Sequence, residues 1–532
     1  MTTLRLFVLS VVSGLLMAAA WPAHGFTPLI FIAWVPLLYI QQFLGDTGKK
    51  GMFGYSFTTF LIWNTLTTWW IWNATASGAI VAIILNSIFM AIVFEAFHLS
   101  KKWLFNNQKG FGILIFYWIT WEFFHMNWDL SWPWLTLGNV FASKPSWIQW
   151  YEYTGVLGGT FWILLINILI FKLILNFYHN KKLNFYVDFI IFIVITGLPF
   201  VISFNIFNNY NETNKPVQVV VVQPDIDPYT QEFNLPADTI IQKNLSLAIP
   251  LLTDSTKYLL LPESTLQDNI WENTLWRSPS LKNLQKFVKK YPELSILVGA
   301  STFRWLQPDE KKTNAARHYK DNLYYYAYNT AFFIDNSPYI QVHHKSKLVP
   351  GVEKMPSWGF LQPLEKYAIN LGGVVGSLGV DKKIQLFSNN QTDTQIAPLI
   401  CYESVYGDYV AKMVKMGASV IFVITNDGWW GKTPGYRQHF LFDVLRAIET
   451  RRDVAQASTT GISGFINQKG EILQQTKYWE KTALKQNVNL NTYKTYYVKQ
   501  GDYFGRISSY ISVLILLVSI VQGILKKQKS LF

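Results

Sequence analysis

The chain contains one cysteine, Cys401, which stands where an apolar segment gives way to polar residues. The segment before it, residues 396–400, has the length and composition of a buried strand. A cysteine at the end of a strand is presented at the tip of a turn, much as nucleophile elbows present serine. A nearby lysine and the backbone N–H groups of such a turn favour the thiolate, which is the nucleophilic form. A lone cysteine is more often an inert buried residue, so this hypothesis needs support from other residues.

Two further segments place a charged side chain directly after a predicted strand. Glu263 follows the apolar residues 257–261 and a proline, and a carboxylate at the edge of a sheet suits a general base. Lys345 follows two histidines, where its ammonium group could stabilise a developing oxyanion, and Glu353 is a second carboxylate within reach. Taken one at a time, these segments are equally typical of ordinary solvated loops. The eight histidines show no metal-ligand spacing, so no metal site is predicted.

The elements that must position these residues include a large apolar part. Half of the 532 residues are hydrophobic, 17% are aromatic and only 15% are charged, which together indicate contact with lipid. Eight apolar runs approach or reach the length needed to cross a bilayer: residues 4–21, 28–43, 53–72, 79–98, 111–124, 157–177, 183–206 and 507–525. The first run resembles a signal peptide, but further spanning runs follow at once, so we interpret it as a retained helix.

The basic residues are distributed so that they orient these runs. The formal charge is +13, but no basic-aromatic module accompanies it, so binding to nucleic acid is not expected. With the N-terminus in the cytoplasm, the short outside loops carry only Lys144. The inside loops then carry eleven basic residues: Arg5, Lys49, Lys50, Lys101, Lys102, Lys109, Lys181, Lys182, Lys526, Lys527 and Lys529. This bias follows the positive-inside rule and predicts that both termini are cytoplasmic.

The long segment between the seventh and eighth runs has a different composition. Short apolar strands are predicted at residues 217–222, 257–261, 295–298, 396–400 and 419–425, and helices at 281–291 and 438–451. Strands that alternate with helices predict a layered α/β domain. We therefore divide the chain into a transmembrane bundle of seven helices (1–207), an extracytoplasmic domain (208–505), and a C-terminal transmembrane helix with a cytoplasmic tail (506–532).

Taken together, the three reactive segments resemble the nitrilase superfamily, in which Glu, Lys and Cys occur in this order, each after a strand. The resemblance is carried by Pro262-Glu263, Lys345-x-x-Leu348-Val349-Pro350 with Glu353, Ile400-Cys401-Tyr402-Glu403, Asn426-Asp427-x-Trp429 through Gln438-His439-Phe440, Arg446-Ala447-Ile448-Glu449 and Ser458-Thr459-Thr460-Gly461. Lys347 is an alternative candidate for the lysine of this motif, but the spacing to the Leu-Val-Pro stretch favours Lys345.

The eight apolar runs narrow the resemblance to the membrane-embedded branch of the superfamily, the apolipoprotein N-acyltransferase family. Trp132-Pro133-Trp134-Leu135 with Gly138 is similar to an outside loop of that family. Two stretches depart from its usual pattern. Gly351-Val352 stands where the family usually has Phe-Gly, and His343-His344 stands where it has an aromatic residue followed by Asn.

The resemblance implies a fold, a site and a reaction. The fold is a membrane α-helical bundle of about eight transmembrane helices plus an αββα sandwich domain. The catalytic residues are Glu263, Lys345 and Cys401, and supporting or substrate-binding residues are Glu353, Glu403, Tyr402, Pro350, Trp429, Trp132 and Trp134. The reaction moves an acyl chain from a phospholipid, through a Cys401 thioester, to the N-terminal amine of a diacylated apolipoprotein. No cofactor is implied, and we expect a monomer in the bacterial inner membrane with its catalytic domain on the periplasmic side.

Two other functions remain open at this point. A membrane-tethered amidase of the same superfamily would pass the acyl group to water or ammonia, but it needs no bundle of eight helices. A transporter with an accessory outer domain would place charged residues along a path within the membrane. Glu95, Glu122, Lys172 and Asp188 mostly fall near the ends of the apolar runs, and a transporter explains neither Cys401 nor Lys345.

The asymmetry of basic residues leads to a test of the topology. A reporter fused after Phe532 is expected in the cytoplasm and one inserted near Thr313 outside it, because an even number of spans places both termini on one side. Phosphatase and fluorescent-protein fusions, which are active on opposite sides of the membrane, measure both positions. Either reporter on the other side would show that the number of spans is wrong by at least one.

Overall fold

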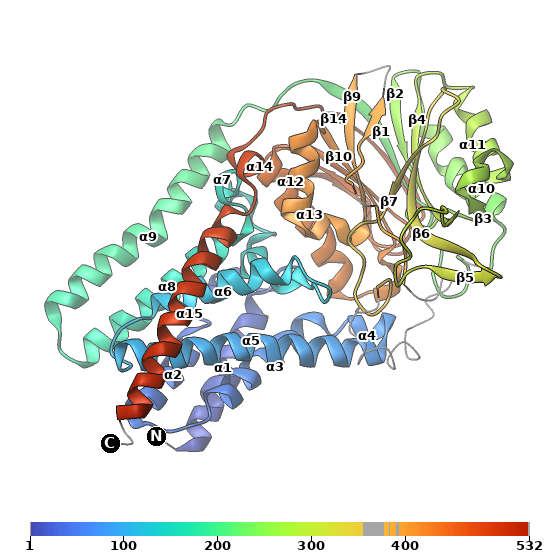
Figure 1. Ribbon diagram of the computed structural model, residues 1–532. Helices are drawn as coiled ribbons and strands as arrows, with labels where there is room; N and C mark the ends of the chain where they lie inside the picture. Colours follow the sequence, from blue (N-terminus) through green and yellow to red (C-terminus); the bar gives the residue numbers. More distant parts are fainter. Residues whose placement is uncertain (1, 233, 355–376, 382, 390–392, 530–532) are drawn as a thin grey trace. The chain divides into compact units, whose positions relative to one another are not determined.

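The computed structural model describes residues 2–232, 234–354, 377–381, 383–389 and 393–529 (Figure 1). The chain forms two compact units. We call the first the helical unit; it comprises Met1–Trp72, Ala79–Asn209 and Gln500–Phe532. We call the second the sheet unit; it comprises Asn73–Gly78 and Tyr210–Lys499.

All eight apolar runs of the sequence coincide with helices. These are α1 (Thr3–Ala20), α2 (Val35–Thr47), α3 (Met52–Thr68), α5 (Ala76–Phe105), α6 (Gly112–His125), α8 (Val156–Tyr178), α9 (Lys182–Asn209) and α15 (Tyr503–Lys529). Six segments in the described part of the chain are long and apolar enough to cross a membrane: Thr3–Ala20, Thr27–Thr47, Ala76–Phe105, Val156–Tyr178, Lys182–Asn209 and Tyr503–Gln528. The remaining two helices, α3 with 17 residues and α6 with 14, are shorter.

The outer surface of the helical unit is apolar. Helix α9 buries only Ser203 against the protein, although its sequence is rich in Phe, Ile and Val. Most large hydrophobic side chains of α15 are also exposed. Helices whose apolar side chains face outward are stable in lipid and not in water, so the helical unit is a membrane bundle.

Inside the helical unit, aromatic rings and a few paired polar groups fill the core. Trp34 packs edge-on against Trp118 with ring centroids 4.5 Å apart, and both rings are buried. Glu122 is buried and accepts hydrogen bonds from the indole of Trp118 at 3.0 Å, the hydroxyl of Thr160 at 2.6 Å and the amide of Leu137 at 2.8 Å. An apolar surrounding offers no water, so such a carboxyl is tolerated only with internal partners.

The sheet unit contains two sheets. The first has the order β14-β1-β2-β4-β6-β5, with β3 paired to β4 and β7 paired to β6. Its strands are β1 (Pro216–Gln223), β2 (Thr256–Leu260), β3 (Leu266–Trp271), β4 (Ser295–Trp305), β5 (Arg317–Lys320), β6 (Leu323–Ile334), β7 (Gln341–His344) and β14 (Thr482–Asn489). The second has the order β13-β12-β11-β10-β9-β8. Its strands are β8 (Phe387–Asn389), β9 (Thr394–Ile400), β10 (Val420–Thr425), β11 (Val454–Ser458), β12 (Gly464–Ile466) and β13 (Ile472–Gln475).

The two sheets pack face to face, and helices cover their outer faces. Because side chains alternate along a strand, Val220 and Val222 of β1 face helices α10 (Ala237–Ala248) and α11 (Pro279–Val288), in one apolar cluster with Ile241 and Leu284. Between the sheets, Tyr258 of β2 contacts Phe422 of β10 with ring centroids 5.1 Å apart. Helices α12 (Gly407–Met416) and α13 (Pro434–Thr450) cover the second sheet (Figure 1). The predicted αββα sandwich is therefore confirmed.

The strands and helices predicted within this unit are present, but some elements were missed. The predicted strand at 295–298 extends to Trp305, and the predicted helix at 438–451 begins earlier, at Pro434. Strand β6 was not predicted, because its Tyr-rich sequence lacks a run of aliphatic residues. This strand pairs with β4, β5 and β7 in the first sheet and contributes Asn329 to the site described below.

Candidate active site

Three buried residues from distant parts of the chain meet at the ends of strands. Glu263 follows β2, Lys345 follows β7, and Cys401 follows β9. The ammonium nitrogen of Lys345 lies 3.1 Å from Glu263 Oε1 and 2.7 Å from Glu353 Oε1. The thiol of Cys401 lies within electrostatic reach of both Glu263 and Lys345. The structure therefore brings together the three residues that the sequence suggested, with Glu353 beside them.

Both oxygens of the Glu263 carboxylate accept hydrogen bonds. Its Oε1 accepts hydrogen bonds from Lys345 and from the side-chain amide of Asn329, at 3.1 Å and 2.7 Å. Its Oε2 accepts from the backbone amide of Asn426 at 2.9 Å. The backbone of Glu263 lies so close to Gly299 that a Cβ there would fall 1.8 Å from the Glu263 carbonyl oxygen. A side chain at position 299 of β4 would clash with this carbonyl oxygen, so the close contact requires glycine there.

Lys345 remains charged although it is almost fully buried. Burial alone would lower the pKa of its ammonium group, but the charges of Glu263 and Glu353 raise that pKa well above its ordinary value. Glu353 is fixed in turn, because its Oε2 accepts a hydrogen bond from the backbone amide of Val349 at 2.9 Å. One ammonium group between two carboxylates leaves the cluster with a net negative charge next to the thiol.

The thiol of Cys401 carries its proton in this environment. Burial and the negative charge of Glu263 raise its pKa well above the ordinary value, and the opposing influence of Lys345 is smaller. Lys345 lowers the pKa of the thiol, as the sequence led us to expect, but in the resting site this effect is smaller than that of burial and Glu263. Desolvation and the carboxylates outweigh the ammonium group, so a base has to remove the proton during reaction.

The turn that carries Cys401 is unusual and is held from two sides. Cys401 has a φ of 51°, in the left-handed region that non-glycine residues seldom adopt. On one side, Glu403 accepts hydrogen bonds from the amide of Ile400 at 2.9 Å and of Ser346 at 2.7 Å. Burial would raise the pKa of Glu403, but His343 beside it and these amides lower it, so the carboxylate is ionised. Glu403 thus ties the cysteine turn to the segment that carries Lys345.

A histidine supports the other side of the turn. His439 Nε2 lies 3.2 Å from the carbonyl oxygen of Cys401, and His439 Nδ1 lies 2.9 Å from Asp427 Oδ1. Burial alone would lower the pKa of His439, but Asp427 raises it to about 9. The ring is therefore protonated at neutral pH and donates to both oxygens. Its position on α13 fixes the strained backbone of Cys401.

The remaining residues suggested by the sequence lie in different surroundings. Tyr402 is buried and meets Tyr406 edge-on, and Trp429 contacts Tyr229 in the same way. Pro350 is partly exposed and forms an isolated bridge with Lys354. Trp132 and Trp134 belong to the helical unit, where their rings stack 5.4 Å apart and Trp134 is fully buried.

Asn329 belongs to the site, but the sequence did not predict it. It bonds to Glu263 at 2.7 Å and to Glu353 at 3.3 Å, and its backbone carbonyl accepts from the amide of Lys345 at 2.8 Å. The one available signal was a single amide side chain in the aromatic run of residues 323–334. Within the residues that the structure describes, no group of three His, Cys, Asp or Glu side chains is arranged to hold a metal ion.

Comparison with known families matches both parts of the chain. A family model described as the apolipoprotein N-acyltransferase N-terminal domain matches residues 13–169, and one described as carbon-nitrogen hydrolase matches residues 237–497. Two similar proteins, both named apolipoprotein N-acyltransferase, come from Chlorobaculum tepidum and Geobacter metallireducens. The first is 28% identical over 97% of each chain, and the second is 25% identical over 94% of this chain and 92% of the other.

Among solved structures, the chain is similar to yeast Nit3, a member of branch 10 of the nitrilase superfamily. The two are 12% identical, with a TM-score of 0.37, over 52% of this chain and 91% of the other.

His344 stands where the family usually has Asn, and its two acidic neighbours lead to a prediction about how the stability of the fold depends on pH. Burial alone would lower its pKa, but Asp381 and Glu272, each 2.7 Å away, raise it to about 9. A pKa that is higher in the folded chain stabilises the fold below the unfolded value near 6.5, and this contribution is lost as the pH rises through about 9. The upper limit of that contribution is about 3 kcal/mol.

The variant His344→Asn should therefore unfold at a lower temperature than the wild type at pH 6.5, and the difference should shrink towards pH 10. Thermal unfolding of the detergent-solubilised protein across this range measures it, and His318→Asn, at an exposed histidine, is the matched control. A difference that does not change with pH would contradict the assigned protonation of His344.

Proposed function

Because this chain belongs to the apolipoprotein N-acyltransferase family, we propose that it transfers an acyl chain from a phospholipid to the α-amine of a diacylglyceryl-cysteine at the N-terminus of an apolipoprotein. The observation that carries this proposal is the buried cluster of Lys345 with Glu263 and Glu353 beside the single cysteine of the chain. Such a cluster supplies a nucleophile, a base and an oxyanion partner in one water-poor place.

In the first half-reaction, the sulfur of Cys401 attacks the carbonyl carbon of a phospholipid ester while Glu263 takes the thiol proton. Because the pKa of Cys401 is raised, a base has to take the thiol proton for the sulfur to act as a nucleophile. Lys345 and a backbone N–H near Cys401 stabilise the oxyanion of the tetrahedral intermediate. The intermediate then breaks its carbon–oxygen bond, Glu263 returns the proton to the leaving oxygen, and a lysophospholipid departs from the thioester.

In the second half-reaction, the free α-amine of the apolipoprotein attacks the thioester carbonyl. Glu263 takes a proton from the nitrogen, the carbon–sulfur bond breaks, and the thiol of Cys401 is restored as the amide forms. A thioester suits this step, because an amine attacks it more readily than it attacks the oxygen ester of the donor. The same base and the same oxyanion partner serve both halves.

The other residues around the cluster act through the catalytic ones. Glu353 and Asn329 hold Lys345 and Glu263 in position, and Glu403 holds the turn of Cys401. We propose Tyr402, Pro350 and Trp429 as walls for the substrate in the sheet unit. In the helical unit, Trp132 is a proposed contact for an acyl chain, and the buried ring of Trp134 is proposed to support it from behind.

The proposed location follows from the apolar helices and from the distribution of basic residues. The protein crosses the bacterial inner membrane several times, with residues 1–207 as the bundle and 506–532 as the last helix and tail. Residues 208–505 form the catalytic domain on the periplasmic side, and both termini are cytoplasmic. This side is consistent with the positive-inside rule, and we expect the enzyme to act as a monomer without a cofactor.

The role of the nucleophile is tested by two substitutions. Cys401→Ala should lower transfer by about 10³-fold or more, because no acyl-enzyme can form. Cys401→Ser should accept one acyl group and then stall, because an oxygen ester is a poorer donor to an amine. Mass spectrometry of the intact protein detects the added acyl group, and an unchanged unfolding temperature confirms that the variants fold. Full activity of Cys401→Ala would refute the central assignment.

The difference between transfer and hydrolysis is tested by what discharges the acyl-enzyme. With phospholipid alone, a long-lived thioester on Cys401 is expected, and a diacylated lipopeptide with a free N-terminal amine should discharge it rapidly with ping-pong kinetics. Positioning of the amine supplies up to about 7–11 kcal/mol of the barrier, which favours it over water. An N-acetylated lipopeptide is the matched control and should leave the thioester intact. Rapid release of free fatty acid without lipopeptide would support a hydrolase instead.

A further inference from the structure

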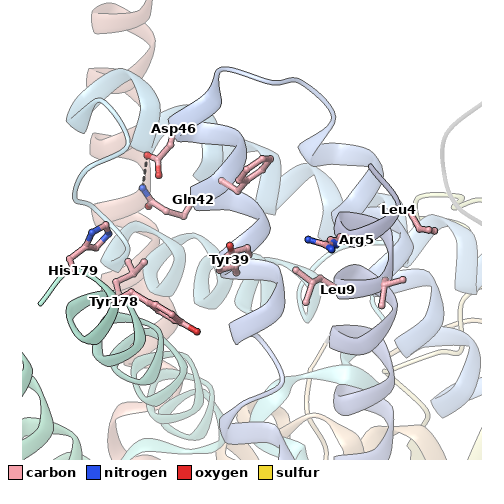
Figure 2. A pocket seen from close by; sticks show the side chains of 11 residues that line it. Leu4, Arg5, Leu9, Tyr39, Gln42, Asp46, Tyr178 and His179 are labelled. Carbon is pink, nitrogen blue, oxygen red and sulfur yellow. Dashed lines mark hydrogen bonds between the residues drawn. The ribbon is translucent and has the colours of Figure 1, made fainter. Parts of the chain in front are cut away.

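A cavity of about 860 Å³ lies in the helical unit between α1, α2 and the end of α8 (Figure 2). Its polar lining residues are Arg5, Tyr39, Gln42, Asp46 and His179, and the rest of its lining is mostly apolar. None of these residues contributes to the candidate active site. Arg5 lies near the start of α1, Asp46 near the end of α2, and His179 directly after α8, so the polar residues gather at one end of the bundle.

Most of the wall is apolar and exposed. Leu4 and Val8 of α1 are 70% and 48% exposed, and Tyr178 of α8 is 76% exposed. These side chains belong to helices that cross the membrane, so their natural neighbours are acyl chains. The cavity is therefore open to lipid along its apolar wall and polar at one end, which is the distribution of polarity in a phospholipid.

The two full charges in the cavity are opposite in sign and do not neutralise each other. Within the described part of the chain, no ion pair involves the guanidinium group of Arg5, and none joins it to Asp46. Figure 2 shows the Arg5 side chain extending toward Tyr39, while Asp46 accepts a hydrogen bond from Gln42 at 2.7 Å. Separated charges at the edge of an apolar region are complementary to a ligand that carries both signs.

We propose that this cavity binds a phospholipid whose headgroup contains both a phosphate and a primary ammonium group, as a phosphoethanolamine headgroup does. Arg5 binds the phosphate, with the hydroxyl of Tyr39 and the ring of His179 as further polar partners, and Asp46 binds the ammonium group. The acyl chains lie against Leu4, Val8 and the other apolar residues of the wall. Asp46 also lies within electrostatic reach of Lys101, so a phospholipid without an ammonium group would lose one favourable contact at Asp46 and not all of them.

The bound lipid differs from the acyl donor. The loops that follow α2 and α8 carry Lys49, Lys50, Lys181 and Lys182, which places the cavity at the basic end of the bundle. On the proposed topology this end faces the cytoplasmic leaflet, whereas the donor is taken from the side of the catalytic domain. The lipid is therefore held and not consumed, and it joins the N-terminal helix to α2 and α8.

Native mass spectrometry of the full-length Cys401→Ala variant tests this site, because this variant consumes no lipid. After delipidation, the protein is titrated with phosphatidylethanolamine, phosphatidylglycerol or phosphatidylcholine. We expect one tightly bound phosphatidylethanolamine that is lost, with about tenfold weaker binding, in Arg5→Gln. The matched control Lys109→Gln removes a basic residue at another loop and should bind as the parent does. Equal binding by Arg5→Gln and the parent would overturn the proposal.

A second variant tests the selection of the headgroup. Asp46→Asn should lose the preference for phosphatidylethanolamine over phosphatidylglycerol, because the partner of the ammonium group is removed while the phosphate site remains. If the parent already binds both lipids equally, the cavity selects only an anion and the proposal is wrong. Phosphatidylethanolamine with a photoreactive acyl chain should label peptides from α1, α2 or α8, and labelling that falls entirely elsewhere would also overturn it. Both outcomes are independent of the catalytic role proposed for Cys401.

Discussion

The structure of the sheet unit depends on the burial of one ammonium group. Lys345 is 1% exposed and has given up its water, so its charge is stable only while Glu263 and Glu353 stay within hydrogen-bonding distance. These partners are 82 and 8 residues away along the chain. Strands β2, β6 and β7 of the first sheet must therefore adopt their final positions before the cluster is electrostatically satisfied, and the segment after β10 adds the backbone amide of Asn426. Removing either carboxylate would leave a buried charge poorly compensated, so the cluster favours a single arrangement of its loops.

The same burial sets the chemistry of the cysteine. A low-dielectric site with net negative charge keeps the thiol of Cys401 protonated, while Glu403 is ionised beside His343 and two backbone amides and His439 is protonated beside Asp427. In the proposed reaction, the thiol therefore keeps its proton until an acyl ester provides a carbon to attack. The strained φ of Cys401 is maintained by Glu403 on one side and His439 on the other. The role of these two residues is positional, since neither is assigned a contact with the reacting atoms.

The helical unit follows a different rule, because its solvent is lipid. Its surface is apolar along α9 and α15, and its buried polar groups, such as Glu122, are satisfied from within. Arg5 and Asp46 line a cavity and are both exposed, so they are not buried charges of this kind. The proposed headgroup would give each of them a partner of opposite charge.

The sequence alone determined the elements whose signal is local. Apolar runs predicted the eight matching helices of the helical unit, short aliphatic runs predicted β1, β2, β4, β9 and β10, and the positions after β2 and β9 singled out Glu263 and Cys401 as candidates. Strand β6 and Asn329 could not be predicted, because a Tyr-rich run has no distinctive period and its burial comes from neighbouring strands. The sequence predicted that a lysine would favour the Cys401 thiolate but not that burial and Glu263 would outweigh it, since a motif shows which charges are near but not how much water is excluded. Only the tertiary structure decided these features, because desolvation and pairing across 82 residues are properties of the packed chain and not of any segment.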